Sequence, residues 1–396
     1  MTMASLPLNG ITVVALEHAV AAPIATRQLA DLGATVIKIE RPGVGDFARN
    51  YDSTVMGQSS FFVWANRGKQ SLTLDIKKSE GLAVLHQLLG KADVFLQNLA
   101  PGATARLGLD FDTLHKQYKN LIVCDISGYG DSGPYKDKKA YDLLIQAASG
   151  LISVTGSEES PSRTGISIAD ISAGMYAYSG VLSAVIQRYK TNAGVRVEVT
   201  MLEALTEWMS YPLYFNHYGG TPPKRSGIFH PTIAPYGQYP IGDGSVMIFG
   251  LQNEREWKRF CQGVLLRPEL IDDPRFNSNT QRVANRDVLD ELIIDYFKGL
   301  NKAQVATLLD DSDIANSPLN GMDDVWDHPQ FQARDRWRQV QTPAGAIAAL
   351  LPPATISGCE MNMGDVPALG EQTVSILQGL GYTDAAIQAL ADAKVT

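Results

Sequence analysis

The chain has 396 residues, of which 45% are apolar and 19% charged, so it can bury a large core and is not a disordered protein. Its net charge of −8, from 34 basic and 42 acidic residues, excludes a general nucleic-acid binder, because that class needs a basic surface. Three widely separated cysteines form no disulfide framework, which fits a reducing compartment.

No run approaches the roughly 18 apolar residues of a membrane helix. Residues 1–10 lack the charged and apolar regions of a signal peptide. We therefore expect a cytoplasmic protein that binds neither membranes nor nucleic acids.

The first 130 residues alternate between short apolar segments and helical patterns. Strands are predicted at residues 11–16, 35–39, 71–74, 93–97 and 121–126, and helices at residues 23–32 and 80–90. Strands rich in branched residues and separated by helices are typical of a parallel sheet that is covered on both faces. The sequence thus predicts an α/β fold with a Rossmann-like large domain.

A long helix is predicted over residues 171–190, because apolar residues recur there at spacings of three and four. A second face carries the small residues Gly174, Ala177, Val181 and Ala184, which favours close approach of another element, in the core or at an interface. Asn-Ala-Gly at 192–194 ends this helix. A strand over 195–200 and a helix over 201–216 follow.

The regular alternation of strands and helices stops at Gly-Gly-Thr-Pro-Pro, residues 219–223, and this Gly- and Pro-rich segment indicates a linker. We predict a large Rossmann-like domain over residues 1–220 and a smaller α+β domain over residues 225–325. Within the smaller domain we expect a strand at 245–249 and a helix at 289–297. Residues 326–396 are expected to return to the large domain or to reach a partner subunit.

Asp170 is the principal candidate for a catalytic residue. It lies between a predicted Gly-containing strand at 164–169 and the start of the long helix. A lone carboxylate can act as a nucleophile, and the helix N-terminus would favour its ionised form. Asp is equally a favoured N-cap residue. The residues alone leave both interpretations open.

Three other motifs carry less weight. Gly-Asp-Ser-Gly-Pro at 130–134 copies the string around a serine protease nucleophile, but those proteases are all-β and need an upstream histidine and aspartate, so we predict a turn. The G-x-G-x-x-A match at 43–48 follows the second strand rather than the first, which argues against a dinucleotide fingerprint. The acidic cluster at 310–313 lacks a calcium loop's glycine and distal glutamate. No metal site is predicted.

Several strings occur in the order found in one known family. They are Glu-His-Ala-Val-Ala-Ala-Pro at 17–23, Leu-Gly-Ala-Thr-Val-Ile-Lys-Ile-Glu-Arg-Pro at 32–42, Asn-Arg-Gly-Lys-Gln-Ser-Leu-Thr-Leu-Asp at 66–75, Asn-Leu-Ala-Pro-Gly at 98–102, Ser-Gly-Tyr-Gly at 127–130, the segment around Asp170, and Leu-Gly-Tyr at 380–382. Together they resemble the class III CoA-transferases, which include formyl-CoA transferase and carnitine CoA-transferase. The resemblance extends over about the first 200 residues.

The resemblance implies that Asp170 attacks an acyl-CoA thioester and that an aspartyl-CoA thioester follows a mixed anhydride. It implies CoA thioesters as substrates, no tightly bound cofactor and an interlocked homodimer. Backbone N–H groups near Gly250 are expected to hold the developing oxyanions. By position it implies CoA-binding roles for a set of residues. These are His18, Ala19, Arg41, Leu74, Asn98, Leu99, Arg106 and Lys139.

The same family contains α-methylacyl-CoA racemases, which use a histidine and an aspartate as two bases. Their Gly-His-Asp string corresponds here to Ala140-Tyr141-Asp142. Tyr141 thus replaces the histidine, and a phenol is a poor base at neutral pH. The racemase is therefore the less favoured, alternative function. Tyr141 and Asp142 are expected to line the acyl pocket. A non-catalytic CoA-binding protein, in which Asp170 is only a cap, is a third hypothesis.

Two departures bear on the substrate. Val20 stands where formyl-CoA transferases carry a glutamine, and their glycine-rich loop corresponds here to residues 249–253, which include Gly250 and Gln252. Oxalate is therefore not the expected acceptor. His230 and Arg67 are predicted to bind a distal carboxylate. We expect a small dicarboxylic acid as acceptor and succinyl-CoA as donor.

Overall fold

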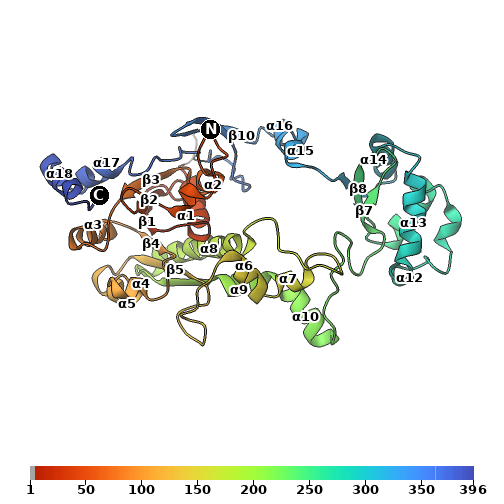
Figure 1. Ribbon diagram of the computed structural model, residues 1–396, viewed down its shortest axis with the longest axis horizontal. Coiled ribbons are helices and arrows are strands. Elements are labelled where there is room, and N and C mark those ends of the chain that lie inside the picture. Colours follow the sequence, from red (N-terminus) through yellow and green to blue (C-terminus); the bar gives the residue numbers. More distant parts are fainter. Residues whose placement is uncertain (1–4, 362) are drawn as a thin grey trace. The chain divides into compact units, whose positions relative to one another are not determined.

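The computed structural model describes residues 5–361 and 363–396, and the chain divides into two compact units (Figure 1). The first unit comprises the chain up to Gly150, Thr164–Ser210 and Ala333–Thr396. The second comprises Leu151–Arg163 and Tyr211–Gln332. In the described ranges, no helix is long and apolar enough to cross a membrane.

A six-stranded parallel sheet forms the centre of the first unit, with the strand order β3-β2-β1-β4-β5-β6. The strands are β1 (Thr12–Leu16), β2 (Thr35–Glu40), β3 (Lys69–Thr73), β4 (Val94–Gln97), β5 (Ile122–Ser127) and β6 (Arg196–Thr200). The order reverses between β1 and β4, as in the Rossmann fold. The predicted α/β class and parallel sheet are confirmed.

Helices cover both faces of this sheet, because strands of Val, Ile, Leu and Phe must be buried on both sides. The helices of the first unit are α1 (Ala21–Asp31), α2 (Ser60–Asn66), α3 (Ser79–Leu89), α4 (Ala103–Arg106), α5 (Phe111–Gln117), α6 (Asp142–Ala148), α8 (Ile168–Thr191) and α9 (Met201–Trp208), with the 3-10 helix η1 (Phe47–Asn50). Apolar side chains of α3 and α5 share one core with β1–β5.

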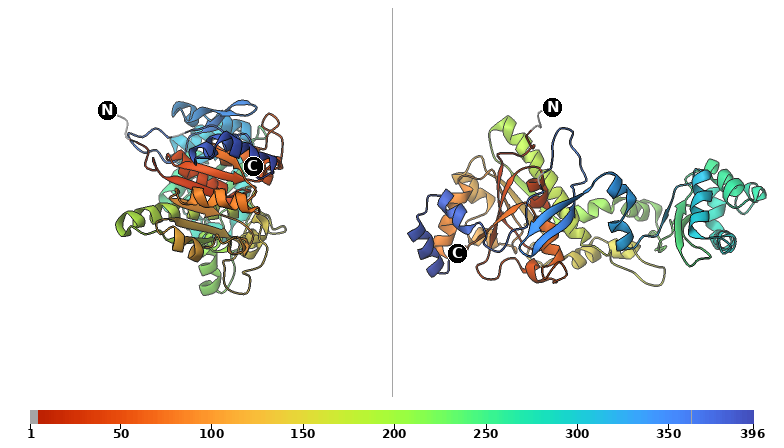
Figure 2. Two further views of the ribbon diagram at one scale, coloured as in Figure 1. Left: turned by 90° about the vertical axis from the view of Figure 1, so that its left-hand side faces the viewer. Right: turned by 90° about the horizontal axis from the view of Figure 1, so that it is seen from above.

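The C-terminal part of the chain packs on the same unit. The hairpin β10 (Trp337–Thr342) and β11 (Gly345–Leu350) lies against α2 through Val340, and α17 (Thr373–Gly379) and α18 (Asp384–Asp392) join the core of α3. Figures 1 and 2 show these two dark-blue helices beside α3. The Asp75 N–H, just beyond the end of β3, donates to the Val395 carbonyl at 2.7 Å, so the last residues are held beside that end of the strand.

The predicted long helix is confirmed as α8, and Asn192 ends it in the left-handed conformation, at φ 54°. Its small-residue face is buried, including Gly174, Ala177, Val181 and Ala184. The other predicted apolar face is only partly buried, since Val185 is 4% exposed whereas Met175 and Tyr189 are 38% and 75% exposed.

Two local predictions were wrong. Residues 164–169 form no strand, because Ile168 and Ala169 already belong to α8 and the residues before them are irregular. The helix predicted over 201–216 is broken at Met209 into α9 and α10 (Ser210–Gly219). Pro212 explains the break, since its ring clashes with the carbonyl four residues earlier in a continuous helix.

The second unit combines a three-stranded antiparallel sheet with short helices around an aromatic core, which fits the predicted α+β class. The strands β7 (Tyr236–Pro240), β8 (Val246–Gly250) and β9 (Asn316–Pro318) lie in the order β7-β8-β9. The helices are α7 (Leu151–Val154), most of α10, α11 (Glu254–Arg259), the π-helix η2 (Phe260–Val264), the 3-10 helix η3 (Pro268–Ile271), α12 (Asn279–Ala284), α13 (Arg286–Phe297), α14 (Lys302–Asp311), α15 (Met322–Trp326) and most of α16 (Pro329–Ala333). Trp257, Phe260 and Phe249 pack against one another in this core.

Candidate active site

A cavity of about 230 Å³ opens at the carboxyl ends of β1 and β2, beside the point where the strand order reverses. Open α/β sheets bind ligands at such a crevice. The structure brings four of the predicted CoA-binding residues together in its wall, namely His18, Arg41, Leu74 and Leu99. The Arg41 guanidinium donates to the Gly45 carbonyl at 3.2 and 3.3 Å, which places it at the rim formed by the β2–η1 loop.

The turn between β1 and α1 carries His18 and Ala19 and is fixed by side chains from two other loops. Asn98 accepts from the His18 N–H at 3.1 Å and donates to the His18 carbonyl at 2.9 Å. Asp46 accepts from the Ala19 N–H at 3.1 Å. Ala19 adopts φ 63°, a conformation that costs energy in residues other than glycine and persists only when its surroundings impose it. Asn98 thus holds the backbone of His18 in place through both of its bonds.

A group of buried, paired charges lies next to this turn. The Lys38 ammonium donates to Asp46 at 2.8 Å and to Glu17 at 3.3 Å, and the Lys69 ammonium donates to Glu17 at 2.6 Å. All of these side chains are buried. Burial raises the pKa of Glu17, but the two lysines outweigh it and leave that pKa below its ordinary value. Buried charges are tolerated only when paired in this way.

Asp170 lies in the first turn of α8, and it is not the N-cap. The N-cap position belongs to Ser167, whose side chain makes no capping bond. Instead, Asp142 at the start of α6 accepts from the Ala169 N–H at 2.8 Å and from the Asp170 N–H at 3.4 Å. The capping interpretation of Asp170 was therefore wrong, because a carboxylate from another helix satisfies these N–H groups.

The Asp142 carboxylate is fully engaged by the protein. Its second oxygen accepts from the Gln146 amide at 2.7 Å, and Gln146 in turn accepts from the Thr164 N–H at 3.1 Å. By contrast, across residues 5–361 and 363–396 the Asp170 carboxylate makes no hydrogen bond or ion pair. The Asp170 carboxylate is therefore available to bind a ligand. Asp142 holds the backbone of Asp170 in place through the N–H groups of residues 169 and 170.

Burial, and secondarily the Asp142 carboxylate, raise the pKa of Asp170 to about 7. This direction is opposite to the effect expected from the helix N-terminus. Two carboxylates that share a site cannot both ionise freely. Asp170 is thus a carboxyl group that titrates near neutral pH, a property that clusters at functional sites.

An aromatic wall borders the site, and the sequence did not identify it. Ring centroids are 4.9 Å apart for His18 and Phe47, 5.8 Å for Phe47 and Tyr51, and 5.5 Å for Tyr51 and Phe61. Burial and the charges of Asp46 and Asp170 raise the pKa of Tyr51 to about 12, so its phenol lies within the field of the candidate nucleophile. For Phe47 the G-x-G-x-x-A string at 43–48 was the available signal, since Gly45, Asp46 and Phe47 line the cavity.

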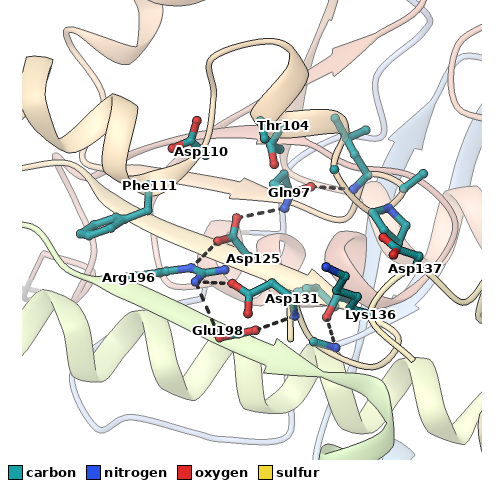
Figure 3. Close-up of a pocket in the computed structure, with 18 of the residues that line it drawn as sticks. Gln97, Thr104, Asp110, Phe111, Asp125, Asp131, Lys136, Asp137, Arg196 and Glu198 are labelled. Atoms are coloured by element: carbon teal, nitrogen blue, oxygen red, sulfur yellow. Dashed lines mark hydrogen bonds and ion pairs between the residues drawn. The ribbon is translucent and has the colours of Figure 1, made fainter. Parts of the chain in front are cut away.

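A second cavity, of about 350 Å³, lies at the carboxyl ends of β4 and β5 and beside the first half of β6 (Figure 3). There Arg196 donates to Asp125 at 2.8 Å and to Asp131 at 2.7 Å. Asp125 accepts from the Gln97 amide at 2.9 Å, and Gln97 accepts from the Leu99 N–H at 2.7 Å. This chain of bonds connects the edge strand to the loop that carries Leu99.

The Gly-Asp-Ser-Gly-Pro string belongs to the loop beside this second cavity. Gly130 and Gly133 have φ values of 92° and 78°, so the string forms a turn, as predicted. Lys139 lies in the exposed continuation of the loop. Arg106 ends the short helix α4. In the part of the chain that the structure describes, no group of His, Cys, Asp or Glu has the arrangement of a metal site.

The remaining predicted residues take different positions. Tyr141, just before α6, is 68% exposed. Arg67 is buried, and its guanidinium donates to both oxygens of Asp31 at 3.1 and 2.8 Å, so it is occupied by a structural ion pair. His230 belongs to the second unit, where it stacks on Tyr236 with the ring centroids 5.2 Å apart.

The backbone N–H groups around Gly250 are used within the second unit. Gly250 donates to the Ala315 carbonyl at 3.4 Å and Leu251 to the Pro235 carbonyl at 3.1 Å. The Gln252 N–H donates to Glu256 at 2.6 Å. Because these donors have partners, the structure does not support the oxyanion role expected for them.

Comparisons with known proteins agree with this architecture. The human succinyl-CoA:glutarate CoA-transferase is 32% identical over 394 residues, covering 98% of this chain and 90% of that protein. The acetyl-CoA:oxalate CoA-transferase of Acetobacter aceti is 33% identical over 377 residues, covering 93% and 95%. A CAIB/BAIF family protein from Brucella suis superposes with a TM-score of 0.85 at 32% identity, covering 95% of this chain and all of that one.

The family model described as CoA-transferase family III matches residues 8–373. This match includes the sheet, the cavity at its carboxyl edge and Asp170. The chain belongs to CoA-transferase family III and is a transferase enzyme.

Proposed function

We propose that the protein transfers CoA from an acyl-CoA donor to a small dicarboxylic acid, with Asp170 as the covalent nucleophile. The observation that carries the proposal is the Asp170 carboxylate itself. It is partly buried, has no protein partner among the described residues, and titrates near neutral pH beside the β1–α1 turn. A carboxylate that is desolvated without a structural partner is suited to attack a carbonyl carbon.

In the proposed reaction an Asp170 oxygen attacks the thioester carbonyl, the C–S bond breaks, and a mixed anhydride and CoA thiolate form. The thiolate then attacks the Asp170 side-chain carbonyl, which releases the donor acid and leaves an aspartyl-CoA thioester. The acceptor carboxylate attacks that thioester, the C–S bond breaks, and a second anhydride forms between Asp170 and the acceptor. The thiolate then attacks the acceptor's carbonyl carbon, and the anhydride C–O bond to Asp170 breaks. Asp170 is regenerated as a carboxylate, and no proton or electron is transferred.

Water is the competing nucleophile at each anhydride and thioester stage, so the site must exclude it. We propose that Phe47, Tyr51 and Phe61 exclude water once substrate covers them, because Tyr51 lies within the field of Asp170 and the three rings adjoin one another. Tyr141 is proposed to close the acyl pocket. Asp142 is proposed to position Asp170 rather than to contact substrate, since both of its oxygens already accept hydrogen bonds.

For CoA we propose contacts in and around the cavity at the carboxyl ends of β1 and β2. Arg41, Arg106 and Lys139 supply cations for its phosphates, as a planar fork or as a point charge. Leu74 packs on the adenine, Asn98 and Leu99 border the pantetheine, and His18 and Ala19 border the thioester. Four of these residues sharing one cavity supports the assignment.

Replacing Arg41 by alanine is expected to raise the KM for acyl-CoA about tenfold, because a charge-assisted bond to phosphate is worth about 1.5 kcal/mol. The kcat is expected to change less than about twofold. Arg275→Ala is the matched control, since this arginine is exposed on the second unit and pairs with Asp273. Equal KM values for the two variants in steady-state assays would contradict the CoA role of Arg41.

A dicarboxylic acceptor is supported by two relatives, whose named acceptors, glutarate and oxalate, each carry two carboxylates. We propose His230 and Gln252 for the distal carboxylate, and succinyl-CoA as donor. The His230 Nδ1 accepts from the Thr232 N–H at 3.3 Å, which leaves its proton on Nε2 as a donor. Arg67 is not part of this proposal, because its guanidinium binds Asp31. Transfer assays with a panel of carboxylic acids test the acceptor, and transfer only to monocarboxylic acids would reject the dicarboxylic acceptor.

We also propose a homodimer. Large apolar side chains are exposed on α8, including Ile186 and Tyr189, and on α10, including Tyr214 and Tyr218, the last at 81%. Monomeric proteins rarely expose apolar patches of this kind. Light scattering that showed a monomer would contradict this assignment.

The covalent mechanism is tested by trapping. Protein incubated with an acyl-CoA and then treated with hydroxylamine is expected to carry a hydroxamate on Asp170, which mass spectrometry of the peptide identifies. Asp170→Asn treated identically is the control. The racemase alternative instead predicts exchange of the α-proton of an acyl-CoA in D₂O without any acceptor acid. Exchange without a hydroxamate would overturn the transferase mechanism.

A further inference from the structure

Helices α1 and α8 approach each other unusually closely at Gly174. A Cβ atom at this position would lie 2.6 Å from the Ala21 carbonyl oxygen and 3.4 Å from two side-chain atoms of Ile24. The nearest atom belongs to the backbone of the first residue of α1, so it cannot move aside as the end of a flexible side chain can. The absence of a side chain at Gly174 therefore sets the separation of the two helices at this point.

This contact lies one helical turn from Asp170. Residues four apart on a helix lie on the same face, about 6 Å apart, so Asp170 points toward the same side of α8 as Gly174. Ala21 directly follows the turn that carries His18 and Ala19. Ile171, the residue after Asp170, packs on Val20 and Ile24. The packing of α8 on α1 thus determines where Asp170 lies relative to the β1–α1 turn.

We infer that Gly174 is a positioning residue for the transfer reaction, because it allows α8 to bring Asp170 up to the β1–α1 turn. The inference rests on the proposed role of Asp170 as nucleophile. A methyl group at Gly174 would displace α8 from Ala21 by several tenths of an ångström or more. Reactions that depend on a bound near-attack geometry lose about 100-fold in rate for a displacement of about 1 Å.

Gly180 offers a matched control on the same helix. A Cβ atom there would lie 2.7 Å from a Val197 methyl group, so Gly180→Ala also introduces a close contact, but against β6 and ten residues from Asp170. Both substitutions place alanine in the interior of one helix, where it is favoured over glycine. They differ in the element that they displace.

We expect Gly174→Ala to lower kcat at least tenfold while the KM for acyl-CoA and the Kd for CoA stay within about twofold. Gly180→Ala is expected to keep kcat within about twofold of the parent. Melting temperatures of the two variants separate a loss of stability from a loss of positioning. If Gly174→Ala does not fold, Ile24→Phe enlarges the α1 side of the same contact and is expected to lower kcat in the same way.

A folded Gly174→Ala or Ile24→Phe variant with the kcat of Gly180→Ala would overturn the inference. So would an equal loss of kcat in both glycine variants, since it would indicate a general structural effect. Asp170→Asn separates the inference from the proposed function. Full activity in that variant would remove the function itself, whereas an inactive Asp170→Asn beside an active Gly174→Ala would remove only the positioning role.

Discussion

Asp170→Asn is expected to lower the rate of CoA transfer by at least about 10⁴-fold, because an amide cannot form the anhydride or the thioester on which the proposed reaction depends. CoA binding is expected to stay within about twofold, since no predicted CoA contact is changed. Steady-state transfer assays and calorimetric titration with CoA measure the two quantities. Deamidation would restore activity slowly, so freshly prepared Asp170→Ala is the companion variant.

The same substitution is expected to stabilise the protein at pH 8. Because the pKa of Asp170 is raised from its ordinary value near 4 to about 7, ionising this group costs folding free energy. The cost begins as the pH rises above about 4 and is complete above about 7. It reaches at most about 4 kcal/mol, at about 1.4 kcal/mol for each tenfold change in the protonation equilibrium, and less for a partly exposed group.

A neutral side chain at position 170 avoids this cost, so the melting temperature of Asp170→Asn is expected to exceed that of the parent at pH 8 and to approach it near pH 4. Thermal unfolding at the two pH values provides the comparison. A variant that is less stable than the parent at pH 8 would show that Asp170 has a stabilising partner, and would count against its availability as a nucleophile.

Asp142→Asn is expected to shift the pH dependence of the reaction. In the parent, kcat/KM is expected to rise about tenfold per pH unit below about 7, because the ionised form of Asp170 is the nucleophile. The Asp142 charge contributes to the raised pKa of Asp170. In Asp142→Asn that charge is absent, so the midpoint of the kcat/KM profile is expected at lower pH. The ratio of kcat/KM at pH 6 to kcat/KM at pH 8 is then expected to rise severalfold above that of the parent. Burial still keeps the pKa above its ordinary value.

The control for this experiment is Asp142→Ala. Asparagine retains an oxygen that accepts from the Ala169 and Asp170 N–H groups, whereas alanine leaves both without a partner. Loss of such a cap costs about 1 kcal/mol of stability, and the alanine variant is expected to lose kcat at every pH. A raised KM for the acceptor acid with an unchanged pH midpoint would instead assign Asp142 to the acyl pocket.

The fold was largely predictable from the sequence because local patterns encode it. The β1–β5 strands and α8 appear as branched apolar runs and as a period of three and four, and each lies within a few residues of its predicted bounds. The break at Met209 was missed because the helical period continues through it, while Pro212 acts on the backbone of the preceding turn.

The candidate site was predictable only in part. His18, Arg41, Leu74 and Leu99 meet in one cavity because the carboxyl ends of parallel strands share an edge of the sheet. Arg67 was misjudged because its charge suggested a ligand, whereas its position beside Asp31 supplies a buried partner. Tyr51 was missed, because nothing in its sequence context shows that it lies near Asp170, which is more than 100 residues away.

The sequence by itself determined the α/β class, the family resemblance and the choice of Asp170, because these depend on residue types and their order. Only the tertiary structure decided that Asp142 rather than Asp170 caps α8, and that Asp170 titrates near neutral pH. A pKa depends on burial and on charges that are near in space, and a capping bond depends on a donor and an acceptor within about 3 Å. Both are distances between residues remote in the chain, and residue order alone does not specify them.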